Sequence, residues 1–340
     1  MKILITGGAG FIGINAAKRF VERGDDVTLY DNLCRPGVRG NVEWLSRLPG
    51  PGSFRLIEAD VRDASRLAAA AVGKDVFLHL AGQVAVTTSV TDPRNDFETN
   101  ALGTFNALEA ARHSGSNPIF LFASTNKVYG ELDEIVVEEE PTRYRFRDLP
   151  HGIPETQPLD FHSPYGCSKG AGDQYVHDFA RIYGLRTVVF RQSAIYGPRQ
   201  LGVEDQGWLA WFLIASVCGR PITIYGNGKQ VRDVLWVDDL VDLYLAAVER
   251  IEVAAGEVFN VGGGPERTIS VWSEFGPMLE SLLGRKVPVA SAGWRPGDQK
   301  IFVSDCRKAE RLLGWTPRTS VDEGIRVLHE WVAGNRALFG

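Results

Sequence analysis

Apolar and polar positions follow a repeating order along the first 190 or so residues. Short apolar runs rich in β-branched residues, such as KILIT at 2–6 and DVTLYD at 26–31, alternate with longer segments whose apolar residues have helical spacing. Such runs predict strands buried on both faces, and the longer segments predict amphipathic helices. Strands are expected at 2–7, 26–31, 53–60, 75–82, 118–124 and 186–193, and helices at 11–24, 97–115 and 163–184. Alternating strands and helices predict an α/β fold with a Rossmann-type, doubly wound parallel sheet.

This order breaks after residue 193. The segments that follow, such as 196–208 and 225–240, are rich in Gly, Arg, Gln and Trp. We therefore expect a large domain over residues 1–193 and a smaller lobe over 194–340, with some of its chain crossing back to the large domain. The segment 131–161 has few signals for either element, and a loop of that length is usually functional or mobile.

Composition excludes several classes of protein. The chain of 340 residues has a formal charge of −5 and no run of Lys or Arg, so it lacks the basic patch of a nucleic-acid binder. Its four cysteines are too scattered for a metal site and too few for a disulfide scaffold, which predicts no metal and a cytoplasmic location. The longest apolar stretch, which begins at Trp208, is too short to span a bilayer and predicts a buried helix.

Three glycines, in GGAGFIG, stand between the first strand and the first helix. Such glycines permit a tight turn, close approach of a pyrophosphate and close packing of helix on strand, which predicts a dinucleotide site at the helix N-terminus. Asp31 ends the second strand, where a carboxylate accepts the ribose hydroxyls of NAD and repels a 2′-phosphate. Arg35 lies nearby and argues for NADP, but we favour NAD. Asp60 either borders the adenine or caps a helix. The residues expected to bind the cofactor are Gly7, Gly10, Phe11, Ile12, Gly13, Asp31, Asn32, Arg35, Asp60, Val61, Leu80, Ala81, Gln83, Asn100, Tyr165 and Lys169.

Tyr165 and Lys169 lie one helical turn apart in YGCSK, and therefore on one face of the expected helix. A free tyrosine has a pKa of about 10. A neighbouring ammonium favours the phenolate, which can take a proton from a substrate hydroxyl while hydride leaves the same carbon. Ser124 and Thr125 end the preceding strand, and either of them would hydrogen-bond the reacting oxygen or simply cap the strand. We predict these four residues as catalytic.

The sequence resembles the extended short-chain dehydrogenase/reductase family over essentially its whole length. The motifs that carry this resemblance are the glycine turn, Asp31, HLAG at 79–82, Ser124-Thr125, the Tyr165/Lys169 pair, RDVLWVDDL at 232–240 and LGWTP at 313–317. Members bind NAD(P) and act mainly on nucleotide-linked sugars, and many return the hydride that they remove. Blocks at 77–90, 124–130, 159–175, 205–212 and 226–235 make the resemblance closest to the CDP-sugar 2-epimerases of the family.

The residues after Thr125 separate two branches of this family. Its sugar-nucleotide 4,6-dehydratases typically carry Thr-Asp-Glu here, and the two carboxyl groups supply the acid and base that expel water. This chain has Asn126 and Lys127 instead. An amide is not a useful acid, and a lysine would need a large pKa shift to serve as the base. We expect the pair to bind sugar hydroxyls or a diphosphate oxygen, although Lys127 could also simply face solvent.

Arginine forks commonly hold diphosphates. Arg232 and Arg295 match the positions that do so in the family, Asp298 is a candidate for a ribose hydroxyl, and His162 is either an assistant in proton transfer or a packing residue. The expected substrate-binding residues are Asn126, Lys127, His162, Arg199, Gln200, Gln206, Arg232 and Arg295.

The resemblance implies an isomerase: an NAD-dependent epimerase of a CDP-linked hexose that oxidises C2 and returns the hydride to the other face. An NDP-hexose 4-epimerase would use the same Tyr165 on another carbon. A non-catalytic NAD-binding regulator would not need the Tyr165/Lys169 pair. Sequence spacing selects neither the carbon, the base nor the sugar. The family also leads us to expect a homodimer formed through a helix pair, with no nucleic-acid or membrane partner.

Overall fold

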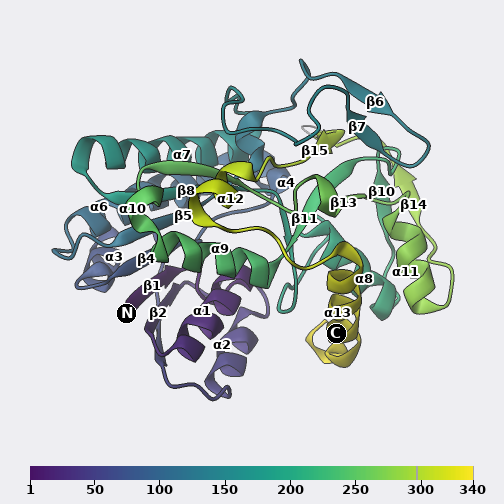
Figure 1. Ribbon diagram of the computed structural model, residues 1–340. Helices are drawn as coiled ribbons and strands as arrows, with labels where there is room; N and C mark the ends of the chain where they lie inside the picture. Colours follow the sequence, from purple (N-terminus) through teal and green to yellow (C-terminus); the bar gives the residue numbers. More distant parts are fainter. Residues whose placement is uncertain (296–297, 340) are drawn as a thin grey trace.

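The computed structural model describes residues 1–295 and 298–339. Its main element is a seven-stranded sheet of order β12-β8-β5-β4-β1-β2-β3, whose neighbouring strands are all parallel (Figure 1). The strands are β1 (Lys2–Thr6), β2 (Asp26–Asp31), β3 (Ser53–Glu58), β4 (Val76–His79), β5 (Ile119–Thr125), β8 (Arg186–Gln192) and β12 (Glu257–Val261). The predicted doubly wound parallel sheet is confirmed.

Helices cover both faces of this sheet, which explains the continuous apolar runs of its strands. On one face lie α1 (Phe11–Arg23), α9 (Val237–Glu249) and α12 (Arg307–Leu313). On the other lie α3 (Ala64–Ala71), α6 (Gly103–Arg112) and α7 (Ser163–Tyr183). Ile3 and Leu78 belong to the first core and Leu4 and Phe77 to the second, so adjacent residues of a strand serve opposite faces.

The expected helix over 97–115 is interrupted. A π-helical turn, η1 (Glu98–Leu102), follows the short α5 (Pro93–Phe97) and precedes α6. π-helical turns are frequent at functional sites, and η1 carries Asn100 beside the start of α7. The catalytic candidates Tyr165 and Lys169 lie in the first two turns of α7.

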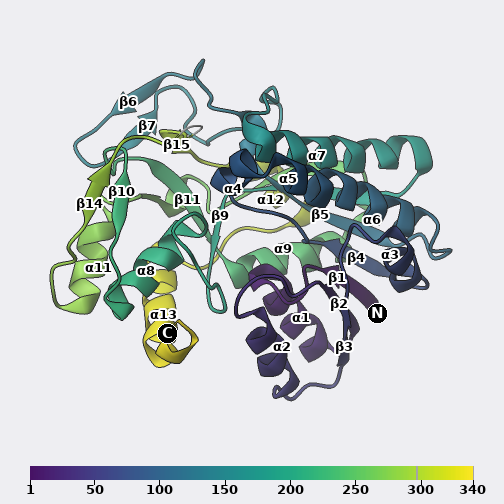
Figure 2. The ribbon, with the colours of Figure 1, turned by 180° about the vertical axis from the view of Figure 1, so that it is seen from behind.

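The smaller lobe contains two further sheets (Figure 2). One joins β9 (Ala194–Tyr196), β11 (Val231–Trp236), β13 (Thr268–Ser270) and β15 (Ile301–Phe302), and the other pairs β10 (Thr223–Tyr225) with β14 (Ala290–Ala292). They pack with α8 (Trp208–Cys218), α11 (Phe275–Leu283) and α13 (Val321–Gly334) around a separate apolar core. The expected loop over 131–161 contains a small hairpin, β6 (Val137–Glu139) and β7 (Tyr144–Phe146).

The second half of the chain returns to the large sheet. β12 is its edge strand beside β8, and α9 packs against α1. β12 and α9 are thus parts of the second half that cross back to the large domain. The division of the chain at residue 193 remains a prediction. The apolar stretch at Trp208 forms the buried helix α8, as predicted. Within the described residues, none of the helices has the length and apolar character needed to traverse a bilayer.

Candidate active site

The glycine turn joins β1 to α1 and forms the floor of a cleft at the carboxyl edge of the sheet. Gly7 has φ of 66°, and a Cβ there would lie 2.8 Å from the backbone nitrogen of Ala81. A Cβ on Gly13 would lie 2.3 Å from the Gly7 carbonyl oxygen. At Gly10, by contrast, a Cβ would meet only that carbonyl oxygen, at 3.2 Å. Close packing within the protein therefore requires glycine at positions 7 and 13. The space beside Gly10 is open toward the cleft, as a bound phosphate would require.

Helix α1 begins at this turn without a capping side chain among the described residues, and its first turn carries no acidic residue. Its free N–H groups and its dipole therefore favour an anion at this end. This is the arrangement that holds a pyrophosphate.

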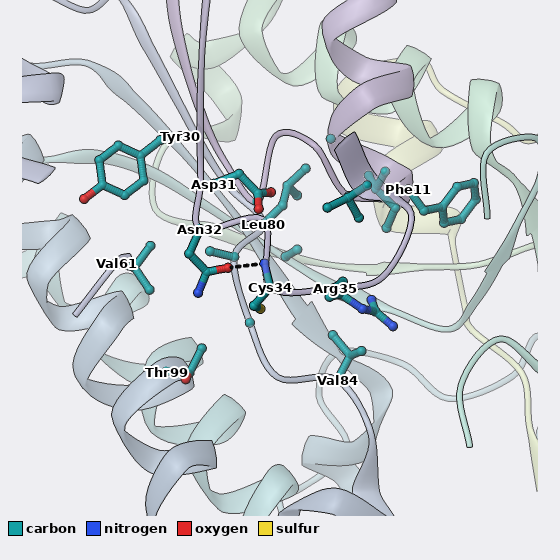
Figure 3. Close-up of a pocket in the computed structure, with 18 of the residues that line it drawn as sticks. Phe11, Tyr30, Asp31, Asn32, Cys34, Arg35, Val61, Leu80, Val84 and Thr99 are labelled. Carbon is teal, nitrogen blue, oxygen red and sulfur yellow. Dashed lines mark hydrogen bonds between the residues drawn. The ribbon is translucent and has the colours of Figure 1, made fainter. Parts of the chain in front are cut away.

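Asp31 lies at the end of β2, in the wall of the same cleft (Figure 3). Its carboxylate accepts hydrogen bonds from the backbone N–H groups of Ala9, at 3.0 Å, and Leu33, at 2.8 Å. Burial raises the pKa of this carboxyl, and these hydrogen bonds oppose the rise. The two backbone donors fix the carboxylate at the position where the ribose of a dinucleotide is expected.

Asn32 and Asp60 face each other across the end of this cleft, with 2.9 Å between the amide nitrogen of Asn32 and a carboxylate oxygen of Asp60. The guanidinium of Arg62 binds both oxygens of Asp60 and lowers the pKa of its carboxyl to about 2. Arg62 was not predicted, since a charged residue after a strand is an unspecific signal. Asp60 thus lines the cleft and does not cap the following helix, whose cap is Asp63.

The cofactor cleft contains nearly all of the predicted cofactor residues. Those that line it are Gly7, Gly10, Phe11, Ile12, Gly13, Asp31, Asn32, Arg35, Asp60, Val61, Leu80, Ala81, Tyr165 and Lys169. Its wall also includes residues that sequence reasoning missed: Tyr30, Cys34, Val84 and Thr99. Tyr30 is one of several apolar residues of β2 and Thr99 lies in η1, and neither they nor the loop residues Cys34 and Val84 belong to a pattern that marks a cofactor position.

Gln83 and Asn100 do not line this cleft among its described walls. The Gln83 side chain donates to the carbonyl of Ala85 and to Asp96. The Asn100 side chain accepts from the backbone N–H of Gln83 and donates to Asp96. Both side chains are committed to hydrogen bonds within the protein.

Tyr165 and Lys169 lie side by side at the inner end of the cleft, as their spacing predicted. Burial raises the pKa of the Tyr165 phenol to about 12, and a hydrogen bond with the Thr125 side chain opposes this rise. The Lys169 ammonium donates to the carbonyl oxygen of Ala123 at 2.6 Å and lies over the Phe122 ring. Burial lowers the pKa of Lys169 to about 8, against the effect of the nearby Asp173 and Asp96.

Ser124 and Thr125 have different partners, which sequence alone left open. The Ser124 hydroxyl donates to Asp173 at 2.7 Å, and Asp173 forms a buried two-pronged ion pair with Arg191. The Thr125 side chain lowers the pKa of the nearby Tyr165 phenol, and its hydroxyl also caps the next turn by accepting from the backbone N–H of Lys127 at 3.3 Å. Thr125 therefore has the geometry expected of a catalytic hydroxyl, whereas Ser124 braces the strand end.

A second cleft opens beyond Tyr165 toward the smaller lobe. It is lined by Thr125, Asn126, Lys127 and Tyr165 from the large domain, and by Gln206, Trp208, Tyr225, Arg232, Arg295 and Asp298 among others from the smaller lobe. Burial and, to a smaller extent, the nearby Arg232 lower the pKa of Lys127 to about 8. The arrangement brings Lys127, Asn126 and the arginines of the smaller lobe around one cleft beside the Tyr165 phenol.

Each arginine of this cleft is paired with a carboxylate. Arg232 binds Asp298 at 2.8 Å, and Arg295 lies 3.4 Å from Asp205 with its guanidinium stacked 3.7 Å over the Tyr225 ring. Tyr225, which sequence reasoning missed, thus sets the plane of one arginine. Gln206 lines both clefts and accepts a hydrogen bond from Arg35.

Three predicted substrate residues lie outside the second cleft as far as its walls are described. His162 is exposed and pairs with Asp160 and Glu131, which raises its pKa. The Arg199 guanidinium stacks on Trp44, in a neighbouring cleft. Gln200 is buried and donates to the carbonyl oxygen of Ile195.

Similarity to known proteins shows the family to which the chain belongs. Residues 4–328 match the family described as GDP-mannose 4,6 dehydratase. The chain belongs to the extended short-chain dehydrogenase/reductase family. Within it, the chain is 44% identical to CDP-paratose 2-epimerase of Salmonella typhi, over 98% of this chain and 99% of that protein.

Solved structures of this family have the same fold. UDP-glucose 4-epimerase of Thermotoga maritima, solved with UDP-glucose, has a TM-score of 0.81 at 33% identity and covers 97% of this chain and 98% of its own. UDP-glucose 4-epimerase of Thermus thermophilus, in complex with NAD, has a TM-score of 0.80 at 31% identity and covers 98% of this chain and all of its own. The predictions of family and fold are confirmed.

Proposed function

We propose that this protein is an NAD-dependent epimerase that inverts C2 of a CDP-linked hexose such as CDP-paratose. The observation that carries the proposal is the end of β5, where Thr125 binds the catalytic phenol and Asn126 and Lys127 line the adjacent cleft. The 44% identity to a CDP-paratose 2-epimerase over nearly the whole of both chains supports this choice of substrate.

The protein's own part in the reaction is proton transfer. Tyr165, as the phenolate, takes the proton of the C2 hydroxyl and returns one to the same oxygen after inversion. Thr125 hydrogen-bonds the phenolate, and Lys169 provides a positive charge held in place by the Ala123 carbonyl. NAD, when bound, accepts and returns one hydride. The open space at Gly10 and the N-terminus of α1 would hold its pyrophosphate. The carboxylate of Asp31, fixed by two backbone N–H groups, would hold its ribose.

The residues beside Tyr165 favour epimerisation over dehydration. Elimination of water needs an acid and a base next to the sugar, and the strand end offers an amide and a cation there. Three carboxylates lie at the far side of the cleft: Asp205 and Asp298 pair with Arg295 and Arg232, and Glu204 accepts a hydrogen bond from the Tyr225 hydroxyl. We assign those two arginines, together with Lys127, to the diphosphate, and Asn126 to the sugar hydroxyls.

A proton NMR time course in D₂O tests the proposed function. The purified holoenzyme is given CDP-paratose and then CDP-glucose without added reductant. Inversion at C2 without deuterium uptake is expected, because the hydride returns from the cofactor and never exchanges with solvent. Inversion at C4, the reaction for which the UDP-glucose 4-epimerases of this fold are named, would refute the choice of carbon. A 4-keto product carrying deuterium would refute the epimerase assignment.

We also propose that the protein forms a homodimer through α6 and α7. Large apolar side chains are exposed along these helices and the segment before them: Phe97, Leu102, Phe105, Tyr175 and Ile182. The rings of Phe105 and Tyr175 lie 5.7 Å apart, so the patch is continuous across the two helices. A contiguous exposed apolar patch of this kind marks a protein interface.

Light scattering after gel filtration tests this interface. Tyr175→Glu is expected to give monomers, because a carboxylate would be buried at the interface. Val253→Glu, at a similarly exposed apolar position on the short helix α10 (Ile251–Ala254), is the matched control and should leave the dimer intact. A Tyr175→Glu protein that remains dimeric would refute this interface.

A further inference from the structure

A fully buried carboxylate lies behind the catalytic turn of α7. Asp96 belongs to α5, which packs against α4 (Val86–Thr91), η1 and α7 (Figure 2). Its side chain has no exposed surface. Burying an ionised carboxylate is costly unless hydrogen bonds compensate for the lost water, so its retention needs a specific reason.

Three neutral donors replace the water around Asp96. The Ser168 hydroxyl donates to one carboxylate oxygen at 2.5 Å. The side-chain amides of Asn100 and Gln83 donate to the other oxygen, at 3.1 and 3.2 Å. Asn100 also donates to Ser168 at 3.1 Å. The two amides that sequence reasoning assigned to the cofactor thus converge on this carboxylate.

The titratable groups that face Asp96 from the described neighbouring elements are Tyr165 and Lys169 of α7. Helix α4 presents only Val, Thr and Ser. In η1, Glu98 is paired at the surface with Arg62 and Arg94. The negative charge of Asp96 therefore acts on both catalytic residues, and Lys169 also faces Asp173 of α7, whose charge acts on it more strongly.

We propose that Asp96 is a positioning residue for the reaction: its buried carboxylate, fixed by Ser168, Asn100 and Gln83, places a negative charge behind the turn of α7 that carries Tyr165 and Lys169. Ser168 lies between the two catalytic residues in the sequence, so the bond to Asp96 also fixes the turn that carries them. This inference rests on the proposed function in so far as it assigns proton transfer to Tyr165.

The sign of the effect follows from the charges. A nearby anion disfavours the phenolate and favours the ammonium, so Asp96 raises the pKa of both Tyr165 and Lys169. Removing the charge lowers both pKa values. The pH dependence of the reaction should therefore move to lower pH, by about one unit for a charge at this range in a buried site.

Asp96→Asn is the decisive variant, and the structure can accommodate it. The amide oxygen would keep the hydrogen bonds from Asn100 and Gln83, while its NH₂ group would donate to Ser168. The Ser168 hydroxyl has a second acceptor, the carbonyl oxygen of Tyr165 at 3.2 Å. Asp96→Ser, which leaves room for a water molecule, is a second neutral variant should the first fold poorly.

Two readouts are needed on the holoenzyme. The pH profile of kcat/KM reports the catalytic group, and the ultraviolet absorbance of the phenolate that is lost in Tyr165→Phe reports ionisation without turnover. Glu98→Gln is the matched control, since it removes a partly exposed carboxylate two residues away that pairs with Arg94. We expect both readouts to shift about one pH unit downward in the Asp96 variants and to stay in place in Glu98→Gln.

Neutral Asp96 variants that fold with both readouts at the wild-type pH would overturn the proposal, even if they are slower. A downward shift that also appears in Glu98→Gln would overturn it as well, because the effect would then be a general one of charge. The phenolate titration does not depend on which sugar is converted. A failure of the proposed substrate would leave this test intact.

Discussion

Replacing Thr125 with valine tests which strand-end hydroxyl serves the catalytic tyrosine. The change keeps the shape of the side chain and removes the hydroxyl that lowers the pKa of Tyr165, together with its bonds to the backbone N–H of Lys127 and the side-chain oxygen of Asn126. Hydrogen bonds to charged groups contribute about 1.5–3 kcal/mol. One pKa unit corresponds to about 1.4 kcal/mol, so the loss should raise the pKa of the phenol by about one to two units. The phenolate is then scarcer at neutral pH.

The expected result is a fall of about 10- to 100-fold in kcat/KM near neutral pH, from the same pKa difference. The deficit should shrink as pH rises through the two pKa values, because both proteins are then ionised. The assay is kcat/KM for epimerisation, followed by NMR across the pH range in which the protein is folded.

Ser124→Ala is the matched control, since its hydroxyl donates to Asp173 and not to Tyr165. It should leave the pH profile unchanged, while Asp173 keeps its ion pair with Arg191. An unchanged profile in Thr125→Val, or a shifted profile in Ser124→Ala, would refute the assignment of the two hydroxyls.

Three further variants test other parts of the site. Asp31→Ser should weaken NAD binding about tenfold and reduce the preference for NAD over NADP, because the carboxylate that accepts ribose hydroxyls and repels a 2′-phosphate is lost. Calorimetric titration with both cofactors measures this, and an unchanged ratio of the two affinities would contradict it. Arg232→Lys should raise KM about tenfold with a smaller effect on kcat, since the guanidinium fork is lost while a charge remains beside Asp298; a loss confined to kcat would contradict a binding role. Asp173→Ala should lower the free energy of unfolding by about 3–5 kcal/mol, because it leaves Arg191 buried and unpaired; a denaturant midpoint near that of wild type would contradict this.

The fold could be predicted because its signals are local. Most strands of the large sheet up to β8 contain an apolar run, whereas the edge strand β3 alternates polar and apolar residues. Helices α1 and α7 both end at glycines with positive φ, Gly24 and Gly184. β12 was not predicted as part of the sheet. Its place beside β8 depends on the chain returning after more than 60 residues, and no local pattern encodes that return.

The candidate site was predictable where the spacing of residues fixes the geometry. The glycine turn and the Tyr165/Lys169 pair are of this kind, since a turn and a helix place them whatever surrounds them. Gln83 and Asn100 were assigned to the cofactor because they follow the right elements. Their side chains instead bind Asp96, and only the packing of α5 beneath α7 reveals this partner.

Four consecutive residues at and just after the end of β5 have different partners. Ser124 binds the buried Asp173, Thr125 lowers the pKa of the Tyr165 phenol, and Asn126 and Lys127 line the second cleft. The first two positions are tied to the core and to the proton-transfer step that oxidation of any sugar carbon requires. The last two line the cleft to which we assign the substrate, so we expect a change there to alter which reaction follows the first proton transfer without disturbing the sheet or the cofactor. This separation explains how one fold with one tyrosine can serve both epimerases and dehydratases, and why the residues after Thr125 carry the functional assignment here.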